Sequence, residues 1–122
     1  MKQTYETGLK GEETAEQYLR EHRKMICLER RFRNKRGEID LIMQEGETIV
    51  FVEVKTRMTG ITGTGMMAVN AAKQKRIYQA AMLYLMTSRR LGCPVRFDVV
   101  EVRPDTVIHV PNAFQPGSMF YR

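Results

Sequence analysis

A β-rich run at Thr48–Arg57 restricts how this chain folds more than any other segment. Its centre, Ile49-Val-Phe-Val-Glu-Val, is apolar at successive positions, whereas the side chains of a strand alternate between the two sides of a sheet. A strand that is apolar on both sides needs cover on both sides, as it has in a layered arrangement of sheet and helices. The run therefore predicts a strand of a sheet whose two faces are covered.

Helical and β-type patterns on both sides of this run follow the order αβββαββ. Apolar residues recur at helical spacing from about Tyr5 to Arg23 and from about Met66 to Leu91, where Gly92 closes the second helix. The expected strands are at about 25–33, 38–43, 48–57, 95–102 and 106–110, with a glycine-rich loop at 58–65 and an irregular tail at 111–122. We expect one domain over residues 1–122 of the α/β or α+β class, with a mixed sheet flanked by helices.

The net charge and the hydrophobic content of the chain indicate a folded protein with an anionic partner. The 122 residues include 20 Lys and Arg against 14 Asp and Glu, which gives a formal net charge of +6. Hydrophobic residues make up 43% of the chain, which excludes the class of disordered chains that lack enough apolar side chains to fold. At this length one modest core is expected. The excess of positive charge favours an anionic partner, and nucleic acid is the best candidate.

Cysteine usage and the N-terminal residues favour a reduced, cytoplasmic protein. The two cysteines, Cys27 and Cys93, form no Cys-x-x-Cys pair, so a structural zinc site is not expected. The first residues contain no apolar segment of the kind found in signal peptides, and the longest strongly apolar stretch is too short to span a bilayer. We therefore expect no membrane association.

Two acids lie inside apolar runs, where an unpaired charge is costly. Glu53 shares one face of its strand with Lys55, and Asp40 interrupts the apolar run of the preceding strand. A hairpin between these strands pairs Asp40 either with Glu53 itself or with Phe51, and both registers bring the two acids together. Adjacent carboxylates repel each other unless a cation lies between them, and Mg²⁺ prefers oxygen ligands. The alternative is that Glu53 and Lys55 form a weak ion pair on a solvated face and that Asp40 marks a strand end.

Each expected helix contributes one further candidate. Glu12 lies at helical spacing with Ala15 and Leu19, so it faces the core side of the first helix. The alternative for Glu12 is an acid that only stabilises a helix near its N-terminus. Lys73 lies one turn before Ile77 on the apolar stripe of the second helix, at the end nearest the glycine-rich loop, where it could contact phosphate.

Basic residues are concentrated around these acids. Eight Lys and Arg fall within residues 20–36, and no Asp or Glu occurs within residues 54–97. Basic residues that contact phosphates give affinity for nucleic acid with little sequence preference. The candidate nucleic-acid contacts are Arg31, Arg33, Lys35, Arg36, Arg57, Lys73 and Arg76.

Several motifs, in order along the chain, resemble the YraN-like family of small uncharacterised bacterial proteins. The motifs span about residues 4–115 and are Gly8-Leu-Lys-Gly-Glu-Glu-Thr-Ala-Glu-Gln-Tyr-Leu, Gly37-Glu-Ile-Asp-Leu-Ile, Val50-Phe-Val-Glu-Val-Lys-Thr-Arg, Lys73 and Arg96-Phe-Asp-Val-Val. That family is similar to the restriction-endonuclease-like PD-(D/E)xK superfamily and, in its layout, to archaeal Holliday-junction resolvases. Ile39 stands where the superfamily's name has a proline, and the Pro104-Asp105 pair follows the Glu-x-Lys segment instead of preceding it.

The resemblance implies a restriction-endonuclease-like αβββαββ core and a role for each candidate. Asp40 and Glu53 would be the metal ligands, Lys55 would orient or activate the attacking water, and Glu12 would complete the catalytic group. The implied activity is Mg²⁺- or Mn²⁺-dependent hydrolysis of phosphodiester bonds in DNA, including structured or branched DNA, with a homodimer as an open expectation. The alternative hypothesis is a non-catalytic nucleic-acid-binding or protein-interaction module on a nuclease-like fold.

Overall fold

The run that was expected to be covered on both sides is the middle strand of a five-stranded mixed sheet. The computed structural model describes residues 2–57 and 69–116, and its strands lie in the order β1-β2-β3-β4-β5. The elements are α1 (Lys2–Arg23), β1 (Ile26–Asn34), β2 (Gly37–Glu45), β3 (Thr48–Thr56), α2 (Ala71–Thr87), β4 (Val95–Arg103) and β5 (Thr106–Val110). The predicted order αβββαββ is confirmed, and the α+β architecture, a five-stranded mixed sheet flanked by two helices, is consistent with a restriction-endonuclease-like core.

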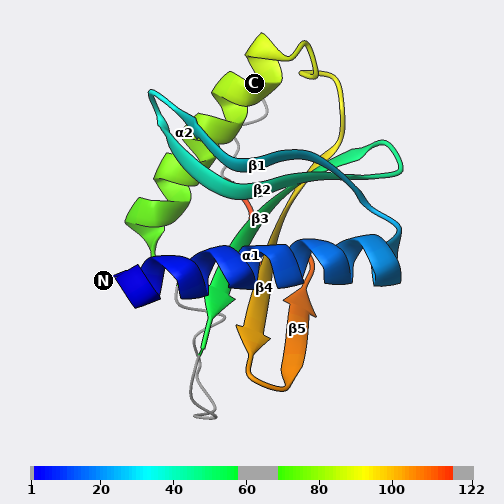
Figure 1. Ribbon diagram of the computed structural model, residues 1–122. Coiled ribbons are helices and arrows are strands. Elements are labelled where there is room, and N and C mark those ends of the chain that lie inside the picture. The colour runs from blue at the N-terminus through cyan, green and yellow to red at the C-terminus, as the bar shows by residue number, and fades with distance from the viewer. Residues whose placement is uncertain (1, 58–68, 117–122) are drawn as a thin grey trace.

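The sheet combines a local meander with one long crossover. Strand β3 pairs antiparallel with β2 and parallel with β4, while α2 makes the connection between the two parallel strands. Strand β5 returns antiparallel along β4. The C-terminal ends of β3 and β4 therefore point the same way, and their arrowheads lie near each other in Figure 1.

The two helices cover opposite faces of the sheet, and each face has its own apolar cluster (Figure 1). On the α1 face, Ala15 and Leu19 are fully buried against side chains such as Val50. On the α2 face, Tyr84 packs edge-on against Phe51, with ring centroids 6.0 Å apart. Because β3 contributes to both clusters, its residues 49–53 are all buried, as its apolar pattern predicted.

Two glycines allow the helices to approach the strands closely. A Cβ atom on Gly11 of α1 would clash with Oγ1 of Thr56, the last residue of β3. A Cβ atom on Gly37, the first residue of β2, would lie 3.2 Å from the carbonyl oxygen of Arg76 in α2. Thr56 is the third residue after Glu53 on β3, and Gly37 is the third residue before Asp40 on β2, so both close contacts lie within three residues of a candidate acid.

The prediction for the second helix was wrong at its C-terminal end. The helix ends at Thr87, because Ser88 caps it through hydrogen bonds to the carbonyl of Tyr84 and Arg89 adopts a left-handed conformation with φ of 60°. Leu91, which was assigned to the buried stripe, is therefore 59% exposed. The expected glycine-rich loop, the start of that helix before residue 69 and the last six residues of the expected tail lie outside the described residues.

Neither helix in the described part of the chain is long and apolar enough to cross a membrane. Cys27 and Cys93 are both free thiols, and each is half-buried.

Candidate active site

Strands β2 and β3 place Asp40 and Glu53 at the same level of the sheet. The hairpin register pairs Leu41 with Val52, and continuing it by one residue sets Asp40 opposite Glu53, as in the first of the two predicted registers. The side chain of Asp40 reaches the neighbouring strand, where its Oδ2 accepts a hydrogen bond of 2.8 Å from the backbone N–H of Val54. Glu53 is only 6% exposed. The geometry thus brings the two predicted metal ligands together in a largely buried position.

The electrostatics of Asp40 reflect this placement. Burial and the negative charge of Glu53 raise the pKa of Asp40 to about 7, although the hydrogen bond from Val54 opposes the shift. Two carboxylates in such surroundings favour any cation that approaches them. Carboxylate oxygens in a partly dehydrated site are ligands that Mg²⁺ and Mn²⁺ bind in proteins.

The cation that lies against this pair comes from the first turn of α2. The Nζ of Lys73 forms an ion pair with Oε2 of Glu53, while Asn70 caps the helix by accepting a hydrogen bond from the backbone N–H of Lys73. Burial alone would lower the pKa of Lys73, but the hydrogen bond and charge of Glu53 prevail and raise it. Lys73 was predicted to contact phosphate, and in the structure its partner is Glu53.

Lys55 follows Glu53 by two residues on β3 and is half-buried. Burial, followed in size by the positive charge of Lys73, lowers the pKa of Lys55. The same lysine feels the negative charges of Glu53 and Asp40. Lys55 therefore places an ammonium group beside the acids. None of the ion pairs among the described residues joins Lys55 to a carboxylate.

Glu12 approaches the site from α1 but is held by an arginine. Its Oε1 accepts a hydrogen bond of 2.8 Å from Nε of Arg31, and its side chain is 15% exposed. Burial raises the pKa of Glu12 against the opposing effect of Arg31, and the charge of Glu53 adds to the rise. Glu12 is thus electrostatically coupled to Glu53, yet its direct partner is Arg31, which was predicted to contact nucleic acid.

The other predicted nucleic-acid contacts lie around the site at differing exposure. Lys35 and Arg36 form the exposed turn between β1 and β2, and Arg33 pairs with Glu38 at the base of that turn. Arg76 is exposed on α2. These four basic residues are available on the surface, whereas Arg57 is half-buried beside an acid of β4.

That acid, Glu101, is a residue that the sequence analysis missed. It is paired with Lys55 in the parallel register of β3 and β4, and its side chain is 0% exposed. Its Oε2 accepts a hydrogen bond from Nε of Arg103, and its Oε1 lies 3.8 Å from Nε of Arg57 without a hydrogen bond. We call Arg57, Glu101 and Arg103 the strand-end triad. An acid inside an apolar run, the signal that identified Asp40 and Glu53, is also present at Val99-Val-Glu-Val.

A second buried acid, Asp98, lies on the other face of β4 and is fully hydrogen-bonded. Arg96 donates two hydrogen bonds to it, and His109 and the backbone N–H of Asn112 donate one each, at 2.7–3.0 Å. Glu45 joins the cluster because it accepts from both Arg96 and Arg23. We call Arg23, Glu45, Arg96, Asp98 and His109 the α1-face network.

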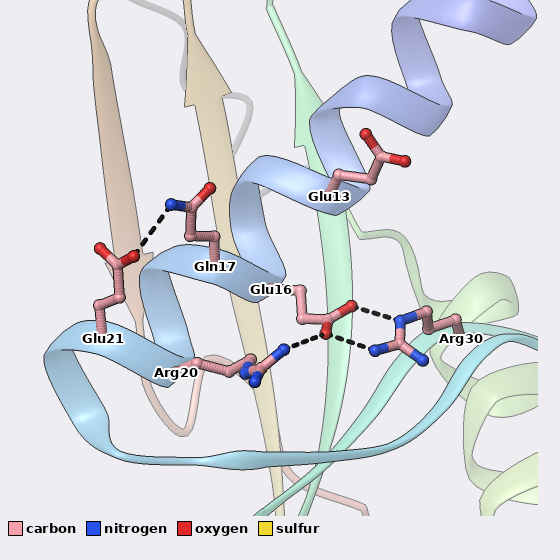
Figure 2. A pocket seen from close by; sticks show the side chains of 6 residues that line it. All are labelled: Glu13, Glu16, Gln17, Arg20, Glu21 and Arg30. Atoms are coloured by element: carbon pink, nitrogen blue, oxygen red, sulfur yellow. Dashed lines mark hydrogen bonds and ion pairs between the residues drawn. The ribbon is translucent and has the colours of Figure 1, made fainter.

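Two cavities of the described residues border α1. One of about 660 Å³ is an open hollow between α1 and β1, lined by side chains of both signs (Figure 2). Within it, both carboxylate oxygens of Glu16 accept hydrogen bonds from Arg30 at 2.7 Å. A smaller one of about 210 Å³ includes Glu12.

Within residues 2–57 and 69–116 no three or more His, Cys, Asp or Glu side chains are arranged to hold a metal ion. Asp40 and Glu53 thus lie together as two carboxylates, and Glu12 remains with Arg31.

A family model and several relatives from bacteria match most of this chain. The family model described as "Uncharacterised protein family UPF0102" matches residues 11–102. A UPF0102 protein of Geobacter metallireducens is 46% identical over 112 residues, which cover 88% of this chain and 91% of the relative. One from Syntrophus aciditrophicus is 45% identical over 102 residues, covering 84% and 80%, and one from Chlorobium chlorochromatii is 40% identical over 121 residues, covering 91% and 92%.

Proposed function

The chain belongs to the uncharacterised protein family UPF0102, the YraN family that its motifs resemble, and from the site in its sheet we propose that it is a metal-dependent nuclease acting on DNA. The observation that carries the proposal is that Asp40 of β2 lies close enough to Glu53 of β3 for the charge of Glu53 to raise its pKa, with Lys55 feeling the charge of both acids. Burying two acids together is unfavourable for the folded chain alone. A function that uses a cation between them accounts for their placement.

Mg²⁺ or Mn²⁺ fits the oxygen ligands that the strands offer. Asp40 and Glu53 would hold the ion, and Glu12 would join them on release from Arg31. When bound, such an ion would polarise the phosphodiester and lower the pKa of a coordinated water, so that this water loses a proton more readily. The raised pKa of Asp40 indicates that this carboxyl group lacks a sufficient counter-charge, whereas Lys73 supplies one to Glu53.

Lys55 and Lys73 provide the remaining chemistry from the protein's own side chains. The ammonium group of Lys55 would donate hydrogen bonds to the attacking water or to the phosphate oxygens, on which negative charge develops. Lys73 would leave Glu53 and turn to the nucleic-acid backbone when the cation takes its place. The exposed residues Arg33, Lys35, Arg36 and Arg76 would contact flanking phosphates and so bind DNA with little sequence preference.

The test is cleavage of fluorescein-labelled four-way junctions, flaps and single strands with Mg²⁺ or Mn²⁺. We expect Asp40→Asn and Glu53→Gln each to lower the cleavage rate by about 10³-fold, because each removes a charge that stabilises the reacting centre. Glu47→Gln, at an exposed acid in the turn between β2 and β3, is the matched control and should cut like the wild type. If no substrate is cut, or if Asp40→Asn cuts at the control rate, the nuclease proposal fails. Binding without cutting would favour the nucleic-acid-binding module.

A further inference from the structure

The strand-end triad differs from an ordinary buried ion pair in its unsatisfied atoms. Oε1 of Glu101 and Nε of Arg57 are both buried, and neither has a hydrogen-bond partner. They lie 3.8 Å apart, so Arg57 is attracted to Glu101 but not fixed by it. Arg103, in contrast, is held through its Nε by the other oxygen of Glu101. The triad therefore has one fixed and one adjustable guanidinium group.

The triad carries an excess positive charge at a place suited to an anion. One carboxylate faces two guanidinium groups, and each guanidinium has five N–H donors of which at most one bonds Glu101. The side chains of Arg57 and Arg103 are 37% and 17% exposed, whereas Glu101 is fully buried beneath them. The exposed ends of both arginines thus remain able to receive a phosphate in the forked geometry that guanidinium groups prefer.

Position relates the triad to the candidate active site. Lys55 and Glu101 are register partners on adjacent strands, and Arg57 follows Lys55 by two residues, immediately after the end of β3. Two residues of a strand span about 6–7 Å. An anion at the triad would therefore lie next to, and not at, the position that Lys55 serves.

We propose that Arg57 and Arg103, oriented by Glu101 beneath them, form a phosphate-binding pair at the C-terminal ends of β3 and β4. The pair binds a backbone phosphate of nucleic acid that neighbours the reacting one. Glu101 is a positioning residue here, because it touches the two arginines and no nucleic acid. The substrate class rests on the proposed function, whereas the binding itself needs no metal and no cleavage.

Binding is measured by fluorescence anisotropy with a fluorescein-labelled four-way junction and a labelled duplex, in EDTA and over a range of salt concentrations. Glu101→Gln raises the formal net charge from +6 to +7, so general electrostatics alone would tighten binding. Loss of the positioning carboxylate should instead weaken binding about five- to tenfold. The matched control is Glu45→Gln, because Glu45 also bridges two arginines and gives the same change in charge. The control should bind at least as tightly as the wild type.

Arg57→Lys and Arg103→Lys keep the charge and test the forked geometry if Glu101→Gln fails to fold. Each should weaken binding about three- to tenfold, and Arg57→Ala should reduce the slope of log affinity against log salt by about one. Thermal unfolding checks that each variant is folded at the assay temperature. If Glu101→Gln binds as tightly as Glu45→Gln, or if both lysine variants bind like the wild type, the phosphate-binding pair is refuted. A wild type that binds neither probe also refutes it, whereas one that binds and does not cut refutes only the nuclease.

Discussion

The two faces of the sheet carry two clusters of buried charge that differ in how completely their acids are hydrogen-bonded. In the α1-face network, both oxygens of Asp98 accept two hydrogen bonds each, and both oxygens of Glu45 are bonded to arginine. On the α2 face, Asp40 relies on one backbone N–H, and Glu101 has an oxygen with no hydrogen bond. A satisfied cluster stabilises a fold, whereas an unsatisfied one keeps capacity for a further partner.

The pKa values of the two aspartates differ in the same sense. Burial acts to raise both, but the hydrogen bonds from His109, Arg96 and Asn112 hold the pKa of Asp98 below its ordinary value. Burial and Glu53 instead raise the pKa of Asp40 to about 7. Perturbed groups of the second kind are enriched at functional sites, because protein surroundings alone do not relieve them.

Substituting Asp98 is expected to give the largest effect on stability. Asp98→Asn leaves the partly buried Arg96 with a weaker partner beside Glu45, and breaking a largely buried ion pair in this way costs about 3–5 kcal/mol in the free energy of unfolding. Asp40→Asn removes a charge that burial disfavours, so at pH 8 and without metal it should unfold no more easily than the wild type. Urea denaturation in EDTA measures both. If the two variants lose equal stability, the distinction between the two clusters is lost.

The dependence of stability on pH should also distinguish Asp40 from Asp98. The folded state binds the proton of Asp40 more tightly than the unfolded state does, so this group's contribution to stability falls as pH rises from about 4 to 7 and is level above. Asp40→Asn has no such loss. Its free energy of unfolding should therefore rise, relative to that of the wild type, by at most about 4 kcal/mol across this pH range. Asp98 has the opposite sign, because its contribution is lost as pH falls. Urea denaturation of wild type and Asp40→Asn between pH 4.5 and 8 checks this, and a constant difference would contradict it.

The smallest expected effect is that of Lys73→Ala on the affinity of the protein for a metal ion. Lys73 competes with any cation for Glu53, so Lys73→Ala should tighten binding of Mn²⁺ about five-fold, which corresponds to roughly 1 kcal/mol. Lys75→Ala is the control, because Lys75 is exposed on the same helix turn. Titration calorimetry or the Mn²⁺ spin resonance signal measures the affinity. Equal tightening by both substitutions would indicate general charge, and weaker binding in Lys73→Ala would show that Lys73 supports the ion.

The sequence predicts the elements better than it predicts the partners of buried charges. The double-sided apolar run of β3 and the hairpin before it are local patterns, so their order and the approach of Asp40 to Glu53 could be anticipated. The end of α2 could not, because it depends on the hydrogen bonds of Ser88 and the left-handed conformation of Arg89. Asp98 and Glu101 show the same pattern of an acid within an apolar run. Only the fold reveals which of the two meets enough donors.

The mixed pairing of the sheet also has a consequence for the order of folding. Asp40 and Val54 are 14 residues apart within one hairpin, so their hydrogen bond closes a short loop. The parallel pairing of β3 with β4 joins residue 49 to residue 95 and must close a much longer one, which slows its formation. The hairpin with its paired acids is therefore expected to form before Glu101 meets Arg57. Asp40 and Glu53 are thus expected to come together earlier in folding than Arg57 and Arg103.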